Sequence, residues 1–270
     1  MARLQRLPGA AFAAHSSMAV VAGVAQALSL AWPWNGAPQW WLQIVSLAVL
    51  AWLVRAPTPW RRAVWLGWAF ATAWLAATFW WLFISMHTYG GLAAPLASAA
   101  VLGLAAFLGT YYAVALGLFA RLAPTHRALA AIVFAALWLL AELARGTLWT
   151  GFPWGAGGYA HVQGPLSALA RTVGVYGVGF VAAVLAMLLA QARTRDLRSL
   201  RAWALVAGGA LVLVCAGLQR QCAIESCHTP ARQPSAPISL ALLQGNIPQN
   251  EKFEAGSGVP GHGFVRAVPG

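Results

Sequence analysis

Residues 142–166 read ELARGTLWTGFPWGAGGYAHVQGPL, and they interrupt a chain that otherwise consists of long apolar runs. The stretch is itself apolar and aromatic, but it is dense in residues that break helices. These are Gly146, Gly151, Pro153, Gly155, Gly157 and Gly158. A continuous helix does not survive so many breakers, and irregular backbone at membrane depth is tolerated only against protein or a cavity. We therefore expect residues 146–164 to form a broken, partly inserted segment that faces lipid or lines a cleft.

The composition on both sides of this segment is that of a membrane protein. Hydrophobic residues make up 60% of the chain, charged residues 8%, and the mean hydropathy is +0.68, whereas a soluble domain carries about 25% charged residues. Lys and Arg number 17 against five acids. In a soluble protein that excess would suggest a nucleic-acid partner, but here we expect none, because the arginines flank apolar runs. The 15 tryptophans fit the headgroup level of a bilayer.

The apolar runs predict an all-α polytopic bundle within residues 1–218. A membrane span needs about 20 mostly apolar residues to cross ~30 Å of hydrocarbon. By this measure we expect about seven transmembrane helices. Their approximate ranges are Phe12–Ala31, Trp40–Val54, Ala63–Ser85, Leu92–Ala120, Ala128–Leu143, Pro165–Ala190 and Ala202–Leu218.

The arginines predict which way the bundle faces, because positively charged loops stay in the cytoplasm. They gather in alternate connections between the predicted spans: Arg3, Arg6, Arg55, Arg61, Arg62, Arg121, Arg127, Arg193, Arg195, Arg198 and Arg201. The opposite connections carry only Arg145 and Arg171 before the seventh span ends. We therefore expect a cytoplasmic N-terminus and, after an odd number of spans, an extracytoplasmic C-terminal part.

Glu142 is the only carboxylate in the first 195 residues, and it lies near the end of a predicted span. An acid near lipid is costly unless it is paired. Arg145 is three residues further on and is a neighbour on the same helix face. One interpretation is a local ion pair that fastens the helix end. The other is that the two residues order the broken segment beside a lipid headgroup.

The tail of the chain has a different character. Residues 219–237 read as an extracytoplasmic linker that contains Cys222 and Cys227, which form a disulfide or stay free on the oxidising side. Residues Ile238–Leu243 read as a buried strand that ends in a turn. The spacing of Cys and His indicates no metal site, and we expect no cofactor.

Three stretches of the chain resemble the apolipoprotein N-acyltransferases, which are membrane-embedded enzymes of the nitrilase superfamily in the inner membrane of Gram-negative bacteria. These stretches are residues 79–96, residues 137–166 and residues 238–253. The second is the most specific, because its E-x-x-R-G-x-x-x-TGFPW pattern is unusual. The likeness covers about residues 10–255, and it implies that residues 238–270 begin a nitrilase-like domain outside the membrane.

The resemblance implies an activity and two lipid partners. Such enzymes take an acyl chain from a phospholipid donor and place it on the α-amine of a diacylglyceryl-cysteine apolipoprotein. A cysteine thiolate carries the acyl group as a thioester, a glutamate acts as general base, and a lysine stabilises the oxyanion.

The resemblance also assigns residues to a substrate-side site. These are Gly151, Phe152, Pro153, Trp154 and Tyr159, with Glu142 and Arg145 as their support. The family's catalytic Glu, Lys and Cys lie downstream of the 238–248 strand and turn, beyond Gly270, so no catalytic residue is assigned here. We therefore expect the chain to be an N-terminal fragment, from a frameshift, a truncated gene or an incomplete gene prediction, that is inactive alone.

Two other classes of function remain as alternatives. A membrane transporter or lipid-handling protein without chemistry would need polar residues at mid-membrane, and the predicted spans offer almost none. A membrane scaffold with a disordered tail would leave the TGFPW segment unexplained.

Overall fold

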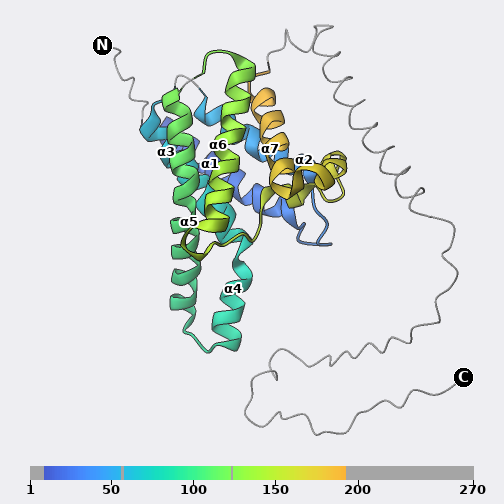
Figure 1. The fold of residues 1–270 in the computed structure, drawn as a ribbon. Coiled ribbons are helices and arrows are strands. Elements are labelled where there is room, and N and C mark those ends of the chain that lie inside the picture. The colour runs from blue at the N-terminus through green and yellow to red at the C-terminus, as the bar shows by residue number, and fades with distance from the viewer. Residues whose placement is uncertain (1–8, 56–57, 123, 193–270) are drawn as a thin grey trace, which may run out of the picture. The chain divides into compact units, whose positions relative to one another are not determined.

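A computed structural model describes residues 9–55, 58–122 and 124–192 of the chain (Figure 1). The predicted seventh span Ala202–Leu218, the linker 219–237 with both of its cysteines, and the predicted nitrilase-like start at 238–270 lie outside the described residues.

Every predicted span within the described residues coincides with a helix or a pair of helices. The α-helices are α1 (Gly9–Leu30), α2 (Trp40–Val54), α3 (Trp60–Thr78), α4 (Trp80–Ile84), α5 (Ala94–Leu122), α6 (Arg127–Thr147) and α7 (Ala170–Ala190). In this part of the chain, four helices are long and apolar enough to cross a membrane, and the bent pair α3–α4 makes a fifth if it is one span. The helix α2 has 15 residues and is shorter than a simple crossing requires.

The predicted span Ala63–Ser85 is not one straight helix. The chain bends by 52° between α3 and the segment Trp80–Tyr89, which contains α4 and one turn of π-helix, η1 (Ser85–Tyr89). No glycine or proline marks this bend in the sequence. Phe79 lies at the break, its side chain is fully buried, and its ring meets that of Phe152 edge-on at 4.9 Å. Packing against the broken segment therefore accompanies a bend that local sequence does not predict.

The predicted span Pro165–Ala190 also begins irregularly. Its first turn is a 3-10 helix, η4 (Pro165–Leu169), and α7 is interrupted at Gly174, which has φ 65° and ψ −177°. Positive φ is open to glycine at little cost. The uninterrupted part of α7 therefore runs from Val175 to Ala190, after a short helical stretch at residues 170–173.

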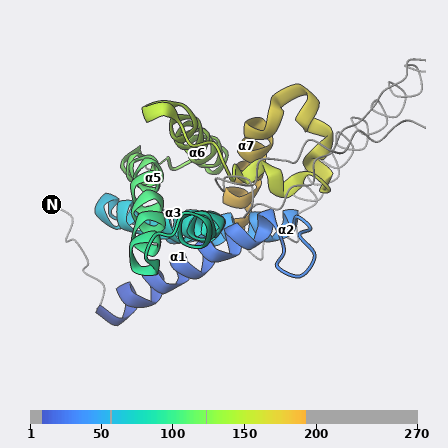
Figure 2. The same ribbon diagram turned by 90° about the horizontal axis from the view of Figure 1, so that it is seen from below.

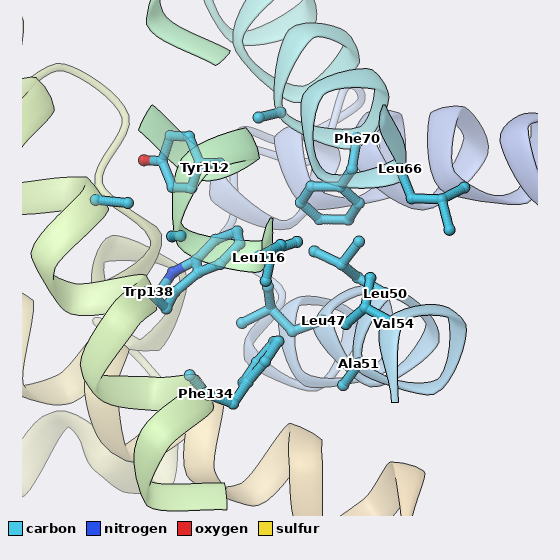
Figure 3. Packing of buried hydrophobic residues seen from close by; sticks show 14 of the residues in the cluster. Leu47, Leu50, Ala51, Val54, Leu66, Phe70, Tyr112, Leu116, Phe134 and Trp138 are labelled. Atoms are coloured by element: carbon cyan, nitrogen blue, oxygen red, sulfur yellow. The ribbon is translucent and has the colours of Figure 1, made fainter. Parts of the chain in front are cut away.

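The centre of the bundle is an aromatic core, which Figure 3 shows from close by. Trp74 of α3 and Trp138 of α6 stack with ring centroids 5.8 Å apart. Tyr112 of α5 lies 4.8 Å from the Trp138 ring. Phe70 and Phe134 complete the cluster against Leu residues of α2 and α5. Such rings bury much apolar area and fix the relative orientation of α3, α5 and α6.

The two ends of the bundle differ: one carries arginines at the helix termini, and the other carries the broken segment. At one end, α2, α5 and α7 finish while α3 and α6 begin, and their termini carry Arg55, Arg62 and Arg127. At the other end, α6 finishes and the chain folds back beside α7 and the start of α2, as Figure 2 shows in yellow. The prediction that arginines gather at one end of the spans agrees with this arrangement.

Candidate substrate-side site at the broken segment

The broken segment, here residues 148–169, contains three short 3-10 turns. They are η2 (Leu148–Thr150), η3 (Gly157–His161) and η4. The helix α6 continues to Thr147, so the break falls slightly later than the predicted start at Gly146. Trp149 and Thr150 have φ values of 54° and 74°. Non-glycine residues seldom adopt this left-handed region, and such strain persists only where surrounding structure imposes it.

Arg145 of α6 holds the turn that contains the TGFPW motif. Its side chain is fully buried. Nη1 donates to the carbonyl oxygens of Phe152 at 2.6 Å and Trp154 at 2.8 Å. Nε donates to Tyr112 Oη at 3.0 Å, and the guanidinium carbon lies 5.9 Å from the Trp74 ring. A guanidinium is a rigid fork of donors, so the aromatic core positions Arg145 and Arg145 positions the turn.

Glu142 holds the next part of the same segment. Its carboxylate is fully buried, and Oε1 accepts a hydrogen bond from the Gly157 N–H at 2.9 Å. A Cβ added to Gly179 of α7 would lie 3.3 Å from Oε2. The absence of a side chain at Gly179 therefore lets the carboxylate sit directly against α7.

Glu142 and Arg145 do not bind each other in the part of the chain that the structure describes. Arg145 Nη1 and Nε bind backbone oxygens and Tyr112, and Glu142 Oε1 binds the Gly157 N–H. The remaining atoms, Glu142 Oε2 and Arg145 Nη2, have no hydrogen-bond partner among the described residues. The interpretation as a local ion pair therefore differs from the geometry. Both residues instead bind the backbone of the broken segment, and a role beside a lipid headgroup stays a prediction.

A buried polar cluster, formed by Gln26, Gln43, Glu142 and His161, surrounds this contact. His161 Nε2 and Gln43 Oε1 are 2.9 Å apart, and because an amide oxygen only accepts, Nε2 carries the proton. A Cβ on Gly157 would lie 3.1 Å from Gln43 Nε2 and 3.3 Å from Gln26 Nε2. Burial lowers the pKa of His161 to about 4, so the imidazole is neutral at neutral pH.

The amides of this cluster were missed in the sequence, although a signal was present. Gln26 and Gln43 are polar residues inside otherwise apolar helices, and both are fully buried. Polar side chains in such helices usually bind across a helix interface. Both amides lie near the ends of α1 and α2 and not in the middle of these helices, so the expectation of almost no polar residues at mid-membrane concerns other positions.

The predicted substrate-side residues divide into two groups. Gly151, with φ 75°, makes the turn, and Phe152 packs inward on Phe79. Pro153, Trp154 and Tyr159 face outward, with Trp154 61% exposed. The Trp154 ring meets that of Trp81 of α4 at 6.0 Å. Trp81 is one of the 15 tryptophans that the sequence places at the headgroup level, and its ring lies beside that of Trp154.

The exposed side chains that this segment brings together with α4 are aromatic. Within residues 9–192, apart from the undescribed positions, no three His, Cys, Asp or Glu side chains come together as metal ligands would. Arg145 and Glu142 bind backbone, and His161 binds the Gln43 side chain. The exposed rings of Trp154 and Trp81 form a surface suited to an amphipathic molecule, since an aromatic ring accepts both apolar chains and headgroups. Tyr159 is exposed as well.

Several helices are long and apolar enough to cross a membrane, and Arg145 and Glu142 hold the broken segment at one end of the bundle by hydrogen bonds. These features are those of a multi-pass integral membrane protein. The family model described as "Apolipoprotein N-acyltransferase N-terminal domain" matches residues 18–188, and the chain belongs to this family. The recognition made from the three sequence stretches is thus confirmed.

Curated relatives carry the corresponding name. The apolipoprotein N-acyltransferase of Verminephrobacter eiseniae is 64% identical over 248 residues, which are 89% of this chain and 46% of the relative. That of Ralstonia nicotianae is 47% identical over 80% of this chain and 40% of the relative. That of Bordetella bronchiseptica is 39% identical over 86% of this chain and 44% of the relative. The chain thus spans somewhat less than half the length of these relatives, and the matches do not favour a transporter without chemistry.

Proposed function

We propose that this chain provides the membrane part of an apolipoprotein N-acyltransferase. The reaction transfers an acyl chain from a phospholipid to the α-amine of a diacylglyceryl-cysteine apolipoprotein. Membership of the family and several membrane-length helices support this assignment. We assign no catalytic role to any described residue. The Glu, Lys and Cys of a thioester mechanism belong to the nitrilase-like domain that we place from residue 238 onward.

The proposed orientation puts the arginine-bearing end in the cytoplasm. The support is the distribution of Arg55, Arg62 and Arg127, which lie at helix termini on one end of the bundle. With Ala202–Leu218 as a seventh span, the linker 219–237 and the residues after it are periplasmic. The broken segment then lies on the same side of the membrane as the proposed acyl-transfer domain.

We propose that the broken segment binds lipidated substrate through its outward-facing groups. The observation that carries this proposal is the attachment of Arg145 to the Phe152 and Trp154 carbonyl oxygens. Because the backbone is held from inside, the Trp154 ring is presented outward and not used for packing the core. Gly151, Phe152 and Pro153 shape the surface, and Trp154 and Tyr159 contact the substrate. Aromatic rings at the headgroup level suit a ligand with a polar head and acyl chains.

The test uses a chimera in which residues 1–192 of this chain replace the corresponding part of the Verminephrobacter relative. Trp154→Ala should lower N-acylation of a diacylglyceryl lipopeptide by about 10-fold, the size expected when a large aromatic contact is removed. The amount of folded protein should not change, because the Trp154 side chain is largely exposed. Turnover is measured by the mass gain of the lipopeptide.

Trp34→Ala is the matched control, because Trp34 is 80% exposed in the connection between α1 and α2. This variant should acylate the lipopeptide at the unaltered rate. Equal rates for Trp154→Ala and the unaltered chimera would leave Trp154 as an interfacial anchor only.

A further inference from the structure

A cavity of about 950 Å3 lies at the arginine-bearing end of the bundle. It is bounded by the ends of α2, α5 and α7 and by the starts of α3 and α6. Its polar side chains include those of His15, Arg55, Thr58, Arg62, Thr125, Arg127 and Gln191. This volume lies within the range of small-molecule sites in proteins.

The described residues that line this cavity include Arg55 and Arg62 and no carboxylate. Glu142 is the only carboxylate in the first 195 residues. It is 15 residues from Arg127 along α6, which corresponds to roughly 22 Å along the helix axis. The cavity and the broken segment therefore lie at opposite ends of the same helix.

Arg55 and Arg62, which both line the cavity, have different partners. Arg55 Nη1 donates to the Ala190 carbonyl oxygen at 3.0 Å, so Arg55 caps the C-terminus of α7. Arg62 Nη2 contacts His15 Nδ1. Because a guanidinium only donates, that imidazole nitrogen is the acceptor of the contact. Arg62 Nε is buried and has no hydrogen-bond partner among the described residues.

Helix capping does not account for Arg62. It lies in the first turn of α3, where the helix dipole disfavours a cation and favours an anion. Its neighbour Arg61 does not line the cavity, and its guanidinium lies over the Trp60 ring at 5.5 Å. Two adjacent arginines of the same helix thus have separate environments, one on an aromatic ring and one in the cavity.

We propose that this cavity binds the phosphate of an anionic phospholipid headgroup from the leaflet at the arginine-bearing end. A guanidinium matches phosphate oxygens with parallel donors, and basic pockets between transmembrane helices bind such headgroups. The remaining lining includes Trp52, Phe119 and Met187, which suit the glycerol and the first acyl carbons. The site goes beyond the proposed acyl transfer, since it lies at the other end of α6 from the broken segment.

The test measures lipid binding to the purified 270-residue chain in detergent micelles by native mass spectrometry and thermal shift. Phosphatidylglycerol should bind and raise the melting temperature, whereas phosphatidylethanolamine and inorganic phosphate at the same concentration should do neither. Arg62→Gln should weaken phosphatidylglycerol binding by about 10-fold, the effect of losing one charge-assisted contact.

Arg61→Gln is the matched control, since it removes the same charge from the adjacent position but outside the cavity. It should bind phosphatidylglycerol as the unaltered chain does. If Arg62→Gln does not fold, Arg62→Lys replaces it and should also weaken binding, because it keeps the charge but loses the parallel donors of the guanidinium. If Arg61→Gln and Arg62→Gln weakened phosphatidylglycerol binding equally, the lipid would be held by diffuse surface charge and the proposed site would be wrong. Equal binding of phosphatidylethanolamine, or saturation by inorganic phosphate, would overturn the anionic-lipid assignment.

Discussion

Arg145 and Arg62 stand at opposite ends of the bundle, and their surroundings are opposite as well. Arg145 is fully buried, and two of its nitrogens bind Tyr112 and the carbonyl oxygens of the TGFPW turn. Arg62 is half-buried beside His15, and its Nε has no partner among the described residues. One arginine completes the protein's own structure, whereas the other is directed toward a cavity. The hydrogen-bond partners therefore indicate a structural role for Arg145 and a binding role for Arg62.

The sharpest test of this comparison replaces each arginine by methionine, which keeps the length of the side chain. Arg145→Met should lower the free energy of unfolding by about 3 kcal/mol or more, because it leaves the part-buried Phe152 and Trp154 carbonyl oxygens and the buried Tyr112 hydroxyl without their donor. Arg62→Met should cost less than about 1 kcal/mol, because its charge is part exposed. Unfolding by SDS titration in mixed micelles measures both. If both variants lost a similar free energy of unfolding, Arg145 and Arg62 would not differ in structural role.

A second test contrasts glycines of the broken segment and of a regular span. A Cβ on Gly158 would lie 2.0 Å from the Val175 carbonyl oxygen of α7, so Gly158→Ala should destabilise the protein by about 2 kcal/mol through backbone displacement. Gly103 lies within α5 and has open space around its added Cβ. Gly103→Ala should therefore be neutral or stabilising by up to about 1 kcal/mol, from helix propensity. Melting temperatures in detergent compare the two, and a tolerated Gly158→Ala would contradict the close approach.

The smallest expected effect is a pH dependence at the broken-segment end. The pKa of His161 is lowered by burial from 6.5 to about 4. The unfolded chain then takes up this proton at higher pH than the folded protein, so stability falls as the pH drops from 6.5 toward 4 and is unaffected by this group above that range. Melting temperatures between pH 7.5 and pH 4.5 measure the decline. His161→Gln keeps a donor for Gln43 and should flatten it, and an unchanged slope would assign it to other groups.

The helices were predictable because long apolar runs leave little choice of structure. Trp40–Val54 was predicted with the bounds that α2 has, and the breakers between Gly146 and Gly158 predicted the loss of regular helix. Both signals are local. Apolar length and breaker density act within about 20 residues of sequence.

The departures from prediction come from contacts between distant residues. At the bend, Phe79 packs on the ring of Phe152, which is 73 residues away in the chain. The spacing of Glu142 and Arg145 placed them on one helix face, but it did not show that the chain returns to offer each a closer backbone partner. Gln26 and Gln43 are a signal in the sequence, since an amide inside an apolar helix usually has a hydrogen-bond partner. Only the fold identifies His161 as the partner of Gln43.

The contact between Arg145 and the TGFPW turn involves main-chain oxygens, which every amino acid supplies at the same place. Arg145 therefore recognises the path of the chain and is indifferent to which ring stands at position 154. Evolution or design can exchange that ring without rebuilding the turn beneath it. Ligand preference and architecture are thereby separately adjustable in this part of the molecule.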